Sequence, residues 1–483
     1  MKASRFNLFF TYDDGTILGY NSRTQSLIEC DRKEYQTYEE WSAGSIPNGL
    51  NEQECEQLNS ELAKGGFLVE DNADELAQIR AQHNIARFMQ RSVGLTIGIT
   101  HDCNLACTYC YEERSDDYLG EPEIPLMLQL TQRLLDRSQA NRLTVTWYGG
   151  EPLLNTRFLY AMSKRLQDLC SKRGIQYASG IVTNGTLLTR RTARTLLKHQ
   201  VTSAQVTLDG PSEINDARRM YRNGKGSFND IVQNIKQTCD LLKINIRVNV
   251  DTRNVGTAKE LLDVLEREGI KEKVLVYFAP VNSLTAKCKT FVGHLYRRRD
   301  FASIEVSLLA ETLERGFRID KSICLPRTMS MGCSMLSPYS LAIDAKKQIQ
   351  KCWMTLCNSD EAVGMLCAPQ PEDKKTVEID LITSRTTNSQ IENMCKWMAH
   401  DPFSFSKCRQ CSLLPSCMGS CPWVVVGLGR DPECPTWKAN IRERIWLFRQ
   451  FSVLVEERNE STGDESSQGV LSQYAKTASS LHS

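Results

Sequence analysis

The chain has 483 residues, of which 41% are apolar and 24% are charged, as in ordinary globular proteins. Fifty-nine basic residues are balanced by 58 acidic ones, which excludes a basic surface over the whole molecule and predicts no nucleic-acid partner. No run of about 18 apolar residues occurs, so no membrane span is expected, and the short apolar stretch near the N-terminus leads into acidic residues, unlike a signal peptide.

The first 90 residues predict a small α+β unit. A turn at Asp13-Asp14-Gly15 separates two strand-like runs, which indicates a hairpin. Phe6, Leu8 and Phe10 alternate along the first run, as in a half-buried strand. The expected elements are strands at residues 6–10 and 17–21 and helices at residues 33–41, 51–65 and 71–90.

Residues 91–320 follow a different rhythm, in which apolar β-rich runs alternate with amphipathic helical stretches. Six strands separated by helices predict βα units and a parallel sheet, which is an α/β fold. In the fifth strand, polar Arg247, Asn249 and Asp251 alternate with apolar residues and predict a polar face open to a ligand; a structural salt bridge of Arg247 and Asp251 is the alternative. The strands are expected at residues 95–100, 143–148, 181–183, 205–208, 246–251 and 274–280.

Nineteen cysteines are the unusual feature of the composition. Because no signal peptide is evident, we expect a cytoplasmic protein, in which thiols stay reduced. An excess of cysteine there indicates metal binding or catalysis, whereas an extracellular chain would suggest disulfides. The spacing of the cysteines has to decide between these interpretations.

The first cluster comprises Cys103, Cys107 and Cys110, spaced C-x3-C-x2-C directly after the first strand of the α/β repeat. Loops at the carboxyl ends of barrel strands carry the chemistry of such folds. Thiolates select zinc or iron–sulfur clusters, and a structural zinc site needs a fourth ligand that does not follow at tight spacing. Three ligands on a cubane would leave one iron open, and three buried structural cysteines are the alternative.

This spacing resembles that of the radical S-adenosylmethionine (SAM) superfamily, and further motifs extend the resemblance over about residues 93–285. Tyr109 stands where this family has an aromatic residue before the third cysteine. WYGGEP, VTNGTLL, VTLDGP, NDARRMYRNGKGSF and RVNVDTRN then follow in the order of the family's motifs. The resemblance implies a partial (β/α)6 TIM-like barrel that binds a 4Fe-4S cluster and SAM.

The same resemblance implies which residues contact SAM. Gly149 and Gly150 lack side chains where backbone approaches a ligand, and Glu151 can accept hydrogen bonds from the methionine ammonium group. Thr207 would meet the ribose and Arg219 the carboxylate. The full set of implied SAM contacts is Tyr109, Gly149, Gly150, Glu151, Asn184, Thr207 and Arg219. No catalytic acid or base is assigned, because a radical can attack an unactivated C–H bond.

The repeat ends near residue 320, and cysteines cluster over residues 321–440, most densely in CRQCSLLPSCMGSC. This segment resembles the SPASM domain, a seven-cysteine extension of peptide-modifying radical SAM enzymes. The seven are Cys333, Cys352, Cys408, Cys411, Cys417, Cys421 and Cys434. Lys347 departs from the family, which usually has glycine five positions before the second cysteine.

Seven thiolates exceed the needs of one cluster, so the resemblance implies two auxiliary 4Fe-4S clusters. Cys408, Cys411, Cys417 and Cys434 would hold one. Cys333, Cys352 and Cys421 would hold the other, with Cys324 as the candidate fourth ligand and an open iron site as the rival. Structural zinc is the alternative for this region.

The other cysteines are expected to pack as small apolar side chains. They are Cys30, Cys55, Cys170, Cys239, Cys288, Cys357, Cys367 and Cys395. The final segment, residues 441–483, predicts a closing helix over 441–457 and then a disordered tail rich in Ser, Gly and charge.

The SPASM resemblance implies a peptide or protein substrate, and two branches compete. One matures ribosomally made peptides (RiPPs) by forming thioether, C–C or ether cross-links. The other is anaerobic sulfatase maturation, which oxidises Ser or Cys to formylglycine and typically has a carboxylate directly after the second SPASM cysteine, where this chain has Trp353. The unit at residues 1–90 resembles an element that captures a leader peptide by strand addition, with a mere cap on the barrel as the alternative.

The sequence therefore predicts a cytoplasmic radical SAM oxidoreductase that acts on a precursor peptide and takes electrons from a donor such as flavodoxin or ferredoxin. An iron–sulfur sensor is the non-enzymatic alternative, but a sensor has no need of the SAM motif WYGGEP. A zinc-scaffolded interaction protein is the third possibility.

Overall fold

The computed structural model describes residues 1–45, 49–282, 292–366 and 387–456. Six parallel strands form its centre, in the spatial order β11-β10-β9-β8-β7-β6. This confirms the predicted α/β class with a parallel sheet, because each expected strand overlaps an observed one. The strands are β6 (Ser92–Gly98), β7 (Arg142–Tyr148), β8 (Gln176–Thr183), β9 (Val201–Thr207), β10 (Lys243–Val250) and β11 (Val274–Pro280).

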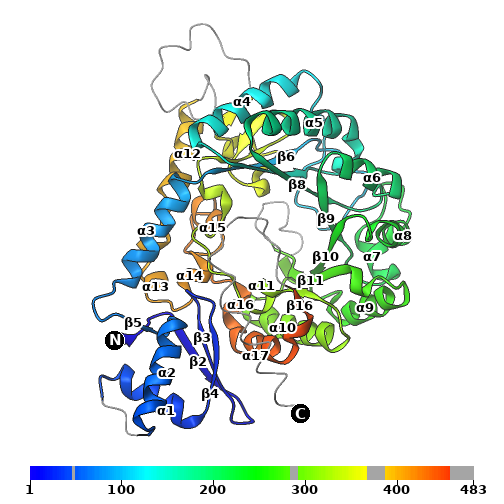
Figure 1. The fold of residues 1–483 in the computed structure, drawn as a ribbon. Helices are drawn as coiled ribbons and strands as arrows, with labels where there is room; N and C mark the ends of the chain where they lie inside the picture. Colours follow the sequence, from blue (N-terminus) through cyan, green and yellow to red (C-terminus); the bar gives the residue numbers. More distant parts are fainter. Residues whose placement is uncertain (46–48, 283–291, 367–386, 457–483) are drawn as a thin grey trace.

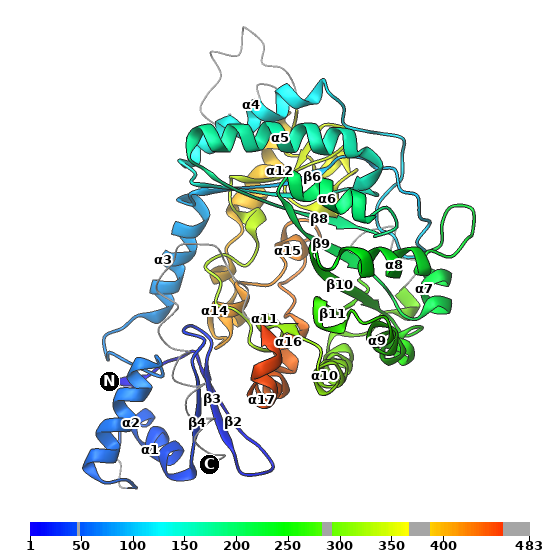
Figure 2. The same ribbon diagram turned by 45° about the vertical axis from the view of Figure 1, so that its right-hand side comes forward.

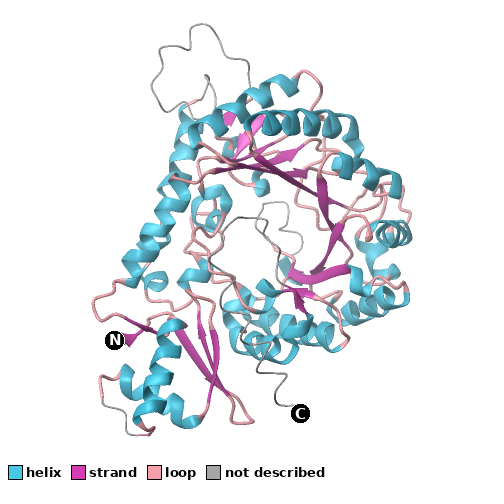
Figure 3. Ribbon diagram, in the orientation of Figure 1, coloured by secondary structure: helices cyan, strands magenta, loops and turns pink. Residues whose placement is uncertain are grey.

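Helices cover the outer side of the strand arc (Figure 1). Apolar residues such as Val145 and Val248 face these helices and are fully buried in the main core. The alternate residues, such as Thr146 and Arg247, point to the opposite side, which we call the inner face. The helices are α4 (Glu123–Ser138), α5 (Thr156–Arg173), α6 (Arg190–Lys198), α7 (Ser212–Arg218), α8 (Phe228–Thr238), α9 (Ala258–Arg267) and α10 (Arg298–Glu314). Figure 3 shows the strands on the inside and the helices around them.

The N-terminal unit contains a three-stranded antiparallel sheet in the order β2-β3-β4. Leu8 and Phe10 of β2 pack with Ile445 of the closing helix, so this sheet docks against the C-terminal part of the chain. Tyr12 stacks on Trp446 with ring centroids 4.5 Å apart. The elements are β1 (Lys2–Ala3), β2 (Asn7–Thr11), β3 (Ile17–Asn21), β4 (Leu27–Cys30), α1 (Arg32–Ser42), α2 (Glu52–Lys64), β5 (Leu68–Val69) and α3 (Glu75–Phe88). Figure 2 shows α3 leading from this unit to the strand arc.

The cysteine-rich part extends the central sheet. β13 pairs parallel to β6, and β14 and β15 follow in antiparallel order, so the sheet has nine strands. The elements are β12 (Ile319–Asp320), α11 (Lys321–Cys324), β13 (Ser340–Ile343), β14 (Gln348–Gln350), β15 (Gly364–Met365), α12 (Asn388–Ala399), α13 (Ser406–Arg409), α14 (Leu414–Cys417), α15 (Pro422–Val426), α16 (Thr436–Ala439), α17 (Ile441–Phe451) and β16 (Val455–Glu456).

The structure also tests the predictions for the closing helix and for the cysteines outside the two clusters. The closing helix is present as α17 but ends at Phe451, since a 3-10 turn and strand β16 follow it. Cys30 and Cys170 are buried as expected, whereas Cys395 is exposed on α12. Cys288, Cys367 and the tail at residues 457–483 lie outside the described residues. Among the helices that the structure describes, none is both long and apolar enough to cross a bilayer.

Candidate functional site

Cys103, Cys107 and Cys110 lie on one loop between β6 and α4, and two neighbouring segments hold this loop. The stretch after α7 runs along one side, where Ala106 N donates to Met220 O at 2.8 Å. In addition, Asn104 Nδ2 of the same loop donates to Thr186 Oγ1 at 2.9 Å, in the segment after β8. The NDARRMYRNGKGSF and VTNGTLL motifs thus both hold the cysteine loop through hydrogen bonds.

The thiol of Cys103 is partly buried and lies near acidic groups. Burial raises the pKa of Cys103 to about 12, and the charges of Glu151, Cys107 and Cys110 act in the same direction. A thiol with this pKa is neutral at pH 7, so the thiolate forms when a metal cation replaces the proton.

Gly149 and Gly150 allow the end of β7 to pass against the start of the cysteine loop. A β-carbon on Gly149 would lie 2.3 Å from Thr100 O, and one on Gly150 would lie 2.3 Å from Asp102 O. Gly149 also has a φ of +126°, which residues with side chains rarely adopt. The close approach is to the chain's own backbone, so the two glycines shape the cysteine loop.

Glu151 is fully buried and accepts three hydrogen bonds from its own chain. Its Oε1 accepts from Leu153 N at 2.9 Å and from Thr183 Oγ1 at 2.8 Å, and its Oε2 accepts from Asn184 N at 2.7 Å. Burial raises the pKa of Glu151, against the effect of these hydrogen bonds. A carboxylate has about four acceptor positions, so one on Oε2 is left for a donor from a ligand.

The side chain of Asn184 is fully engaged within the protein. Its Nδ2 donates to Asn104 Oδ1 at 2.8 Å and to Cys103 Sγ at 3.7 Å. Its Oδ1 accepts from the backbone and hydroxyl of Thr186. Because an amide side chain has two donors and two acceptor lone pairs, Asn184 uses these contacts to position Cys103, and its contact with SAM stays a prediction.

Arg219 is a buried cation beside the cysteine loop. Its Nη1 donates to Tyr109 Oη at 2.8 Å, while its buried Nε has no hydrogen-bond partner. Burial lowers the pKa of Arg219, but the negative charges near it, with Cys107 foremost, outweigh burial and hold the pKa well above its ordinary value. The orphaned Nε–H is therefore a donor available to an anionic group at this site.

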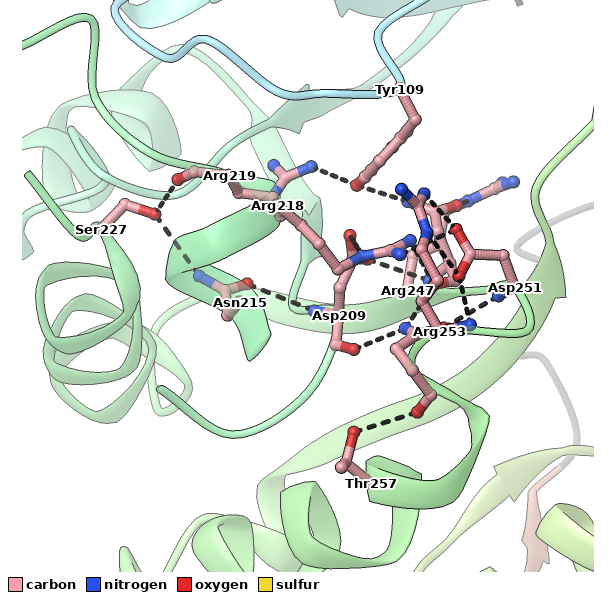
Figure 4. Close-up of polar contacts among 12 residues, drawn as sticks. Tyr109, Asp209, Asn215, Arg218, Arg219, Ser227, Arg247, Asp251, Arg253 and Thr257 are labelled. Carbon is pink, nitrogen blue, oxygen red and sulfur yellow. Dashed lines mark hydrogen bonds and ion pairs between the residues drawn. The ribbon is translucent and has the colours of Figure 1, made fainter. Parts of the chain in front are cut away.

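Arg218 ties together the carboxyl ends of β9 and β10 (Figure 4). Its Nη1 donates to Asp251 Oδ2 at 2.8 Å and its Nε to Asp209 Oδ2 at 3.2 Å, and all three side chains are buried. Asp251 also pairs with Arg253 at 2.7 Å. The suggested salt bridge between Arg247 and Asp251 does not form, because other arginines occupy this carboxylate. Arg218 and Asp209 were not predicted as site residues, although VTLDGP and the Arg–Arg doublet were signals for them.

An aromatic group on the inner face also escaped the sequence analysis. Tyr148 ends β7, and its hydroxyl contacts the hydroxyl of Tyr111, the residue after Cys110. The ring of Trp353, the residue after Cys352, stacks on Tyr148 at 6.0 Å between centroids and 9° between planes. Tyr148 thus contacts both Tyr111, next to the first cysteine cluster, and Trp353, in the C-terminal cysteine-rich part.

Cys333, Cys352 and Cys421 come together around one apolar cluster that contains Trp397 and Trp423. Burial raises the pKa of Cys352, and its two partner thiols add to this effect. Cys324, the candidate fourth ligand, does not join them. It is buried in a separate cluster with Leu309, Leu313, Ile319, Leu447 and Val455.

Cys408, Cys411, Cys417 and Cys434 form a second group. Burial raises the pKa of Cys417 to about 12, and the three other thiols raise it further. Lys438 Nζ donates to Cys411 Sγ at 3.2 Å and places a positive charge beside the group. Burial lowers the pKa of Lys438, but the nearby thiol groups outweigh burial and raise it.

Lys347 takes up the backbone conformation for which the family usually uses glycine. It has a φ of +67° in the turn between β13 and β14, and its N donates to Asp344 O at 3.0 Å. The turn before Cys352 is therefore left-handed in spite of the lysine side chain, at a cost of about 1 kcal/mol.

The donor set fits an iron–sulfur cluster with SAM. Three thiols share one clamped loop, and the orphaned Nε of Arg219 and the remaining acceptor position of Glu151 suit a carboxylate and an ammonium group. Thr207 ends β9 in register with Arg247 and is largely buried. Within the described residues, no three or more His, Cys, Asp or Glu side chains close around a single metal-ion position, so the fit rests on the chemistry of these donors.

Gly149→Ala is expected to destabilise the protein by about 3 kcal/mol, because the new β-carbon meets backbone at a positive φ. Gly256→Ala is the matched control, since a β-carbon there meets nothing within 4 Å, and its stability should change by less than about 1 kcal/mol. Anaerobic urea unfolding followed by circular dichroism measures both. Equal stability of the two variants would contradict the close packing of Gly149.

Comparison with known proteins agrees with this site. Residues 97–265 match the family model described as the radical SAM superfamily. The serine-type anaerobic sulfatase-maturating enzyme of Bacteroides thetaiotaomicron is 34% identical over 138 residues, which are 28% of this chain and 33% of the relative. The antilisterial bacteriocin subtilosin biosynthesis protein AlbA of Bacillus subtilis is 29% identical over 180 residues, 36% of this chain and 37% of AlbA.

The fold is similar to that of a solved structure described as native anSMEcpe with bound AdoMet. The TM-score is 0.56 at 17% sequence identity, over 75% of this chain and 98% of that one, which shows a shared fold. In sequence, the chain matches only about a third of the length of the two curated relatives.

Proposed function

We propose, on the premise that residues 97–265 form a radical SAM domain, that this protein is a peptide maturase. It would cleave SAM reductively and remove a hydrogen atom from a residue of a ribosomally made precursor peptide. The peptide radical would then bond to a second residue of the peptide as a proton is lost and an auxiliary cluster accepts the remaining electron, which gives the cross-link. The observation that carries this proposal is the clamped cysteine loop beside the orphaned Nε of Arg219. The strand arc would be a partial (β/α)6 barrel with the reaction at the carboxyl ends of its strands.

The chain's own residues would bind, orient and shield the reactants. Cys103, Cys107 and Cys110 would hold the 4Fe-4S cluster, which together with SAM supplies the 5′-deoxyadenosyl radical chemistry. Arg219 would bind the SAM carboxylate through Nε, and Oε2 of Glu151 would accept from the ammonium group. Thr207 would lie near the ribose, and Tyr109 would fix the guanidinium of Arg219 through its hydroxyl.

The cysteine-rich region would hold two auxiliary 4Fe-4S clusters. Four thiols are available for the cluster at Cys408, Cys411, Cys417 and Cys434, beside the cation of Lys438. The trio Cys333, Cys352 and Cys421 would leave an open iron position, because Cys324 is buried elsewhere. A flavodoxin or ferredoxin would supply the electrons in the cytoplasm.

The N-terminal unit would select the precursor. Its three-stranded sheet has two edge strands, β2 and β4, and an extended leader peptide can add to such an edge through backbone hydrogen bonds. The face of β2 that carries Leu8 and Phe10 is packed against the C-terminal part, so the added strand would lie in the plane of the sheet.

Sulfatase maturation is the second candidate, favoured by the similarity to the Bacteroides enzyme. Trp353 argues against it, because an indole stacked on Tyr148 cannot accept a proton in place of a carboxylate. A short precursor encoded beside the gene, incubated with enzyme, SAM and dithionite, should lose the mass of two hydrogen atoms for each cross-link. Formylglycine in a sulfatase peptide, with the precursor unchanged, would instead establish the second candidate.

A first test needs no substrate. Reconstituted without oxygen, the protein should contain about twelve iron atoms per chain, four for each of three clusters. With SAM and dithionite it should release 5′-deoxyadenosine, measured by liquid chromatography and mass spectrometry. Iron without 5′-deoxyadenosine would favour an iron–sulfur sensor, and stoichiometric zinc without iron would establish a zinc-scaffolded protein.

A further inference from the structure

Arg247 on the inner face is a cation without an acidic partner in the described part of the chain. It lies on β10 between Ile246 and Val248, which are fully buried on the helix-covered side, so its side chain projects from the opposite face. Its Nε donates to Asn249 Oδ1 at 2.8 Å, and its guanidinium lies 5.9 Å from the ring centroid of Tyr277. These contacts orient the guanidinium but do not neutralise it.

The neighbouring arginines show a different pattern. Arg218 and Arg253 both form ion pairs with Asp251, and Figure 4 shows Arg247 beside this network. No ion pair within the described residues includes Arg247, and its two terminal nitrogens make no hydrogen bond there. A partly buried cation is costly unless an anion pairs with it, so this position favours a negatively charged ligand.

An aromatic surface lies near this cation. Tyr148 ends β7 on the inner face, the side of the sheet from which Arg247 also projects. Burial raises the pKa of the Tyr148 hydroxyl, and the charge of Arg247 acts in the opposite direction. Trp353 stacks on Tyr148 and still exposes 45% of its surface. Glu112 also acts on the pKa of Tyr148 and raises it. A ligand that reaches Arg247 can therefore also contact an apolar ring.

We propose that Arg247 and Trp353 form a substrate subsite that recognises an acidic residue of the peptide. The side-chain carboxylate would accept hydrogen bonds from the terminal nitrogens of Arg247, and an apolar residue next to it would pack on the indole of Trp353. This inference rests on the proposed function, since it names the class of peptide that the maturase takes. Under the proposed function, the carboxylate of SAM would have its own partner in Arg219, whose guanidinium lies beside Cys107.

Binding of two short peptides tests the subsite without any turnover. Dansyl-Gly-Leu-Glu-Leu-Gly amide carries a single carboxylate, and its Gln counterpart carries none. Fluorescence anisotropy on the anaerobic, reconstituted protein with SAM should show about tenfold tighter binding of the Glu peptide, as expected for a charge-assisted hydrogen bond. In Arg247→Gln this ratio should fall to about one. In Trp353→Ala both peptides should bind more weakly, with the ratio retained.

Two controls make the result specific. Arg190→Gln removes a charge from an outer helix, where Arg190 pairs with Asp240, and should keep the wild-type ratio. Arg247→Lys keeps the charge and should retain part of the preference, which separates recognition from a folding defect. Equal binding of both peptides to the wild type, or a tenfold preference that persists in Arg247→Gln, would refute the subsite.

The affinity for SAM identifies the source of the carboxylate. An unchanged SAM dissociation constant in Arg247→Gln supports a peptide carboxylate, whereas loss of SAM binding with the peptide ratio intact would assign Arg247 to SAM and overturn the proposal. The same measurements distinguish failure of the subsite from failure of the proposed function. If the wild type releases 5′-deoxyadenosine but binds the Glu and Gln peptides equally, only the subsite is refuted. If the wild type releases no 5′-deoxyadenosine, the proposed function itself is refuted.

Discussion

Cys107→Ala should reduce the release of 5′-deoxyadenosine to less than about one thousandth of the wild-type amount. Two thiols cannot hold the cluster on the loop, and iron should fall by about four atoms per chain. Cys107 also lies beside the buried guanidinium of Arg219, so the substitution changes the surroundings of the residue proposed to bind the SAM carboxylate. Electron paramagnetic resonance of the dithionite-reduced variant should lack the signal that SAM perturbs in the wild type.

Cys170→Ala is the matched control for this variant. Cys170 is buried on α5 in the main core, remote from the cysteine loop in sequence and packing. Its replacement should cost about 1 kcal/mol of stability and leave the iron content and 5′-deoxyadenosine release near wild type. Full activity of Cys107→Ala, or equal loss in both variants, would contradict the assignment of the cysteine loop.

The parallel sheet was predictable because its strands are apolar runs between helical patterns. The β10 prediction succeeded since buried Ile246, Val248 and Val250 alternate with polar residues. The first half of β8 was missed, because QYASG has no strong apolar alternation. The pairing of β13 with β6 joins segments about 250 residues apart, and no local pattern contains that information.

The candidate site was predictable as a set of motifs but not as a set of roles. The sequence shows that Asn184 is polar and near a glycine, but not that its amide is already satisfied by Asn104, Thr186 and Cys103. From the sequence alone, Arg247 and Arg218 are equally good candidates for the ion pair with Asp251. Which partner a buried charge takes depends on the spacing of strand ends, which only the folded chain defines.

Cysteine spacing grouped the cysteines of the C-terminal part but could not place Cys324. The structure brings Cys333, Cys352 and Cys421 around one apolar cluster because residues of β13, α12 and α15 pack together there. Cys324 follows α10 closely in sequence and ends in the core between α10 and α17. Proximity along the chain was therefore a poor guide to the fourth ligand.

Arg218→Met is expected to cost about 3–5 kcal/mol of folding free energy, the largest effect on stability proposed for this chain. The substitution removes the cation from two fully buried carboxylates, those of Asp209 and Asp251, and only Asp251 keeps a second arginine. The guanidinium also lies 4.9 Å from the ring centroid of Tyr109, so the variant should load less iron on the cysteine loop. Anaerobic urea unfolding and iron analysis measure the two effects.

Arg190→Met, which breaks the exposed ion pair between Arg190 and Asp240, is the control for Arg218→Met. Both residues are about half exposed and form a two-point ion pair, so Arg190→Met should cost less than about 1 kcal/mol. If Arg218→Met does not fold, Arg218→Lys keeps a positive charge but loses the fork that reaches both aspartates, and it should fold with intermediate stability. A cost for Arg218→Met no larger than for Arg190→Met would show that the buried aspartates do not depend on this arginine. The ends of β9 and β10 would then be held by the backbone N of Asn249, which donates to Asp209 Oδ1, and by Nδ2 of Asn254, which donates to Asp209 O.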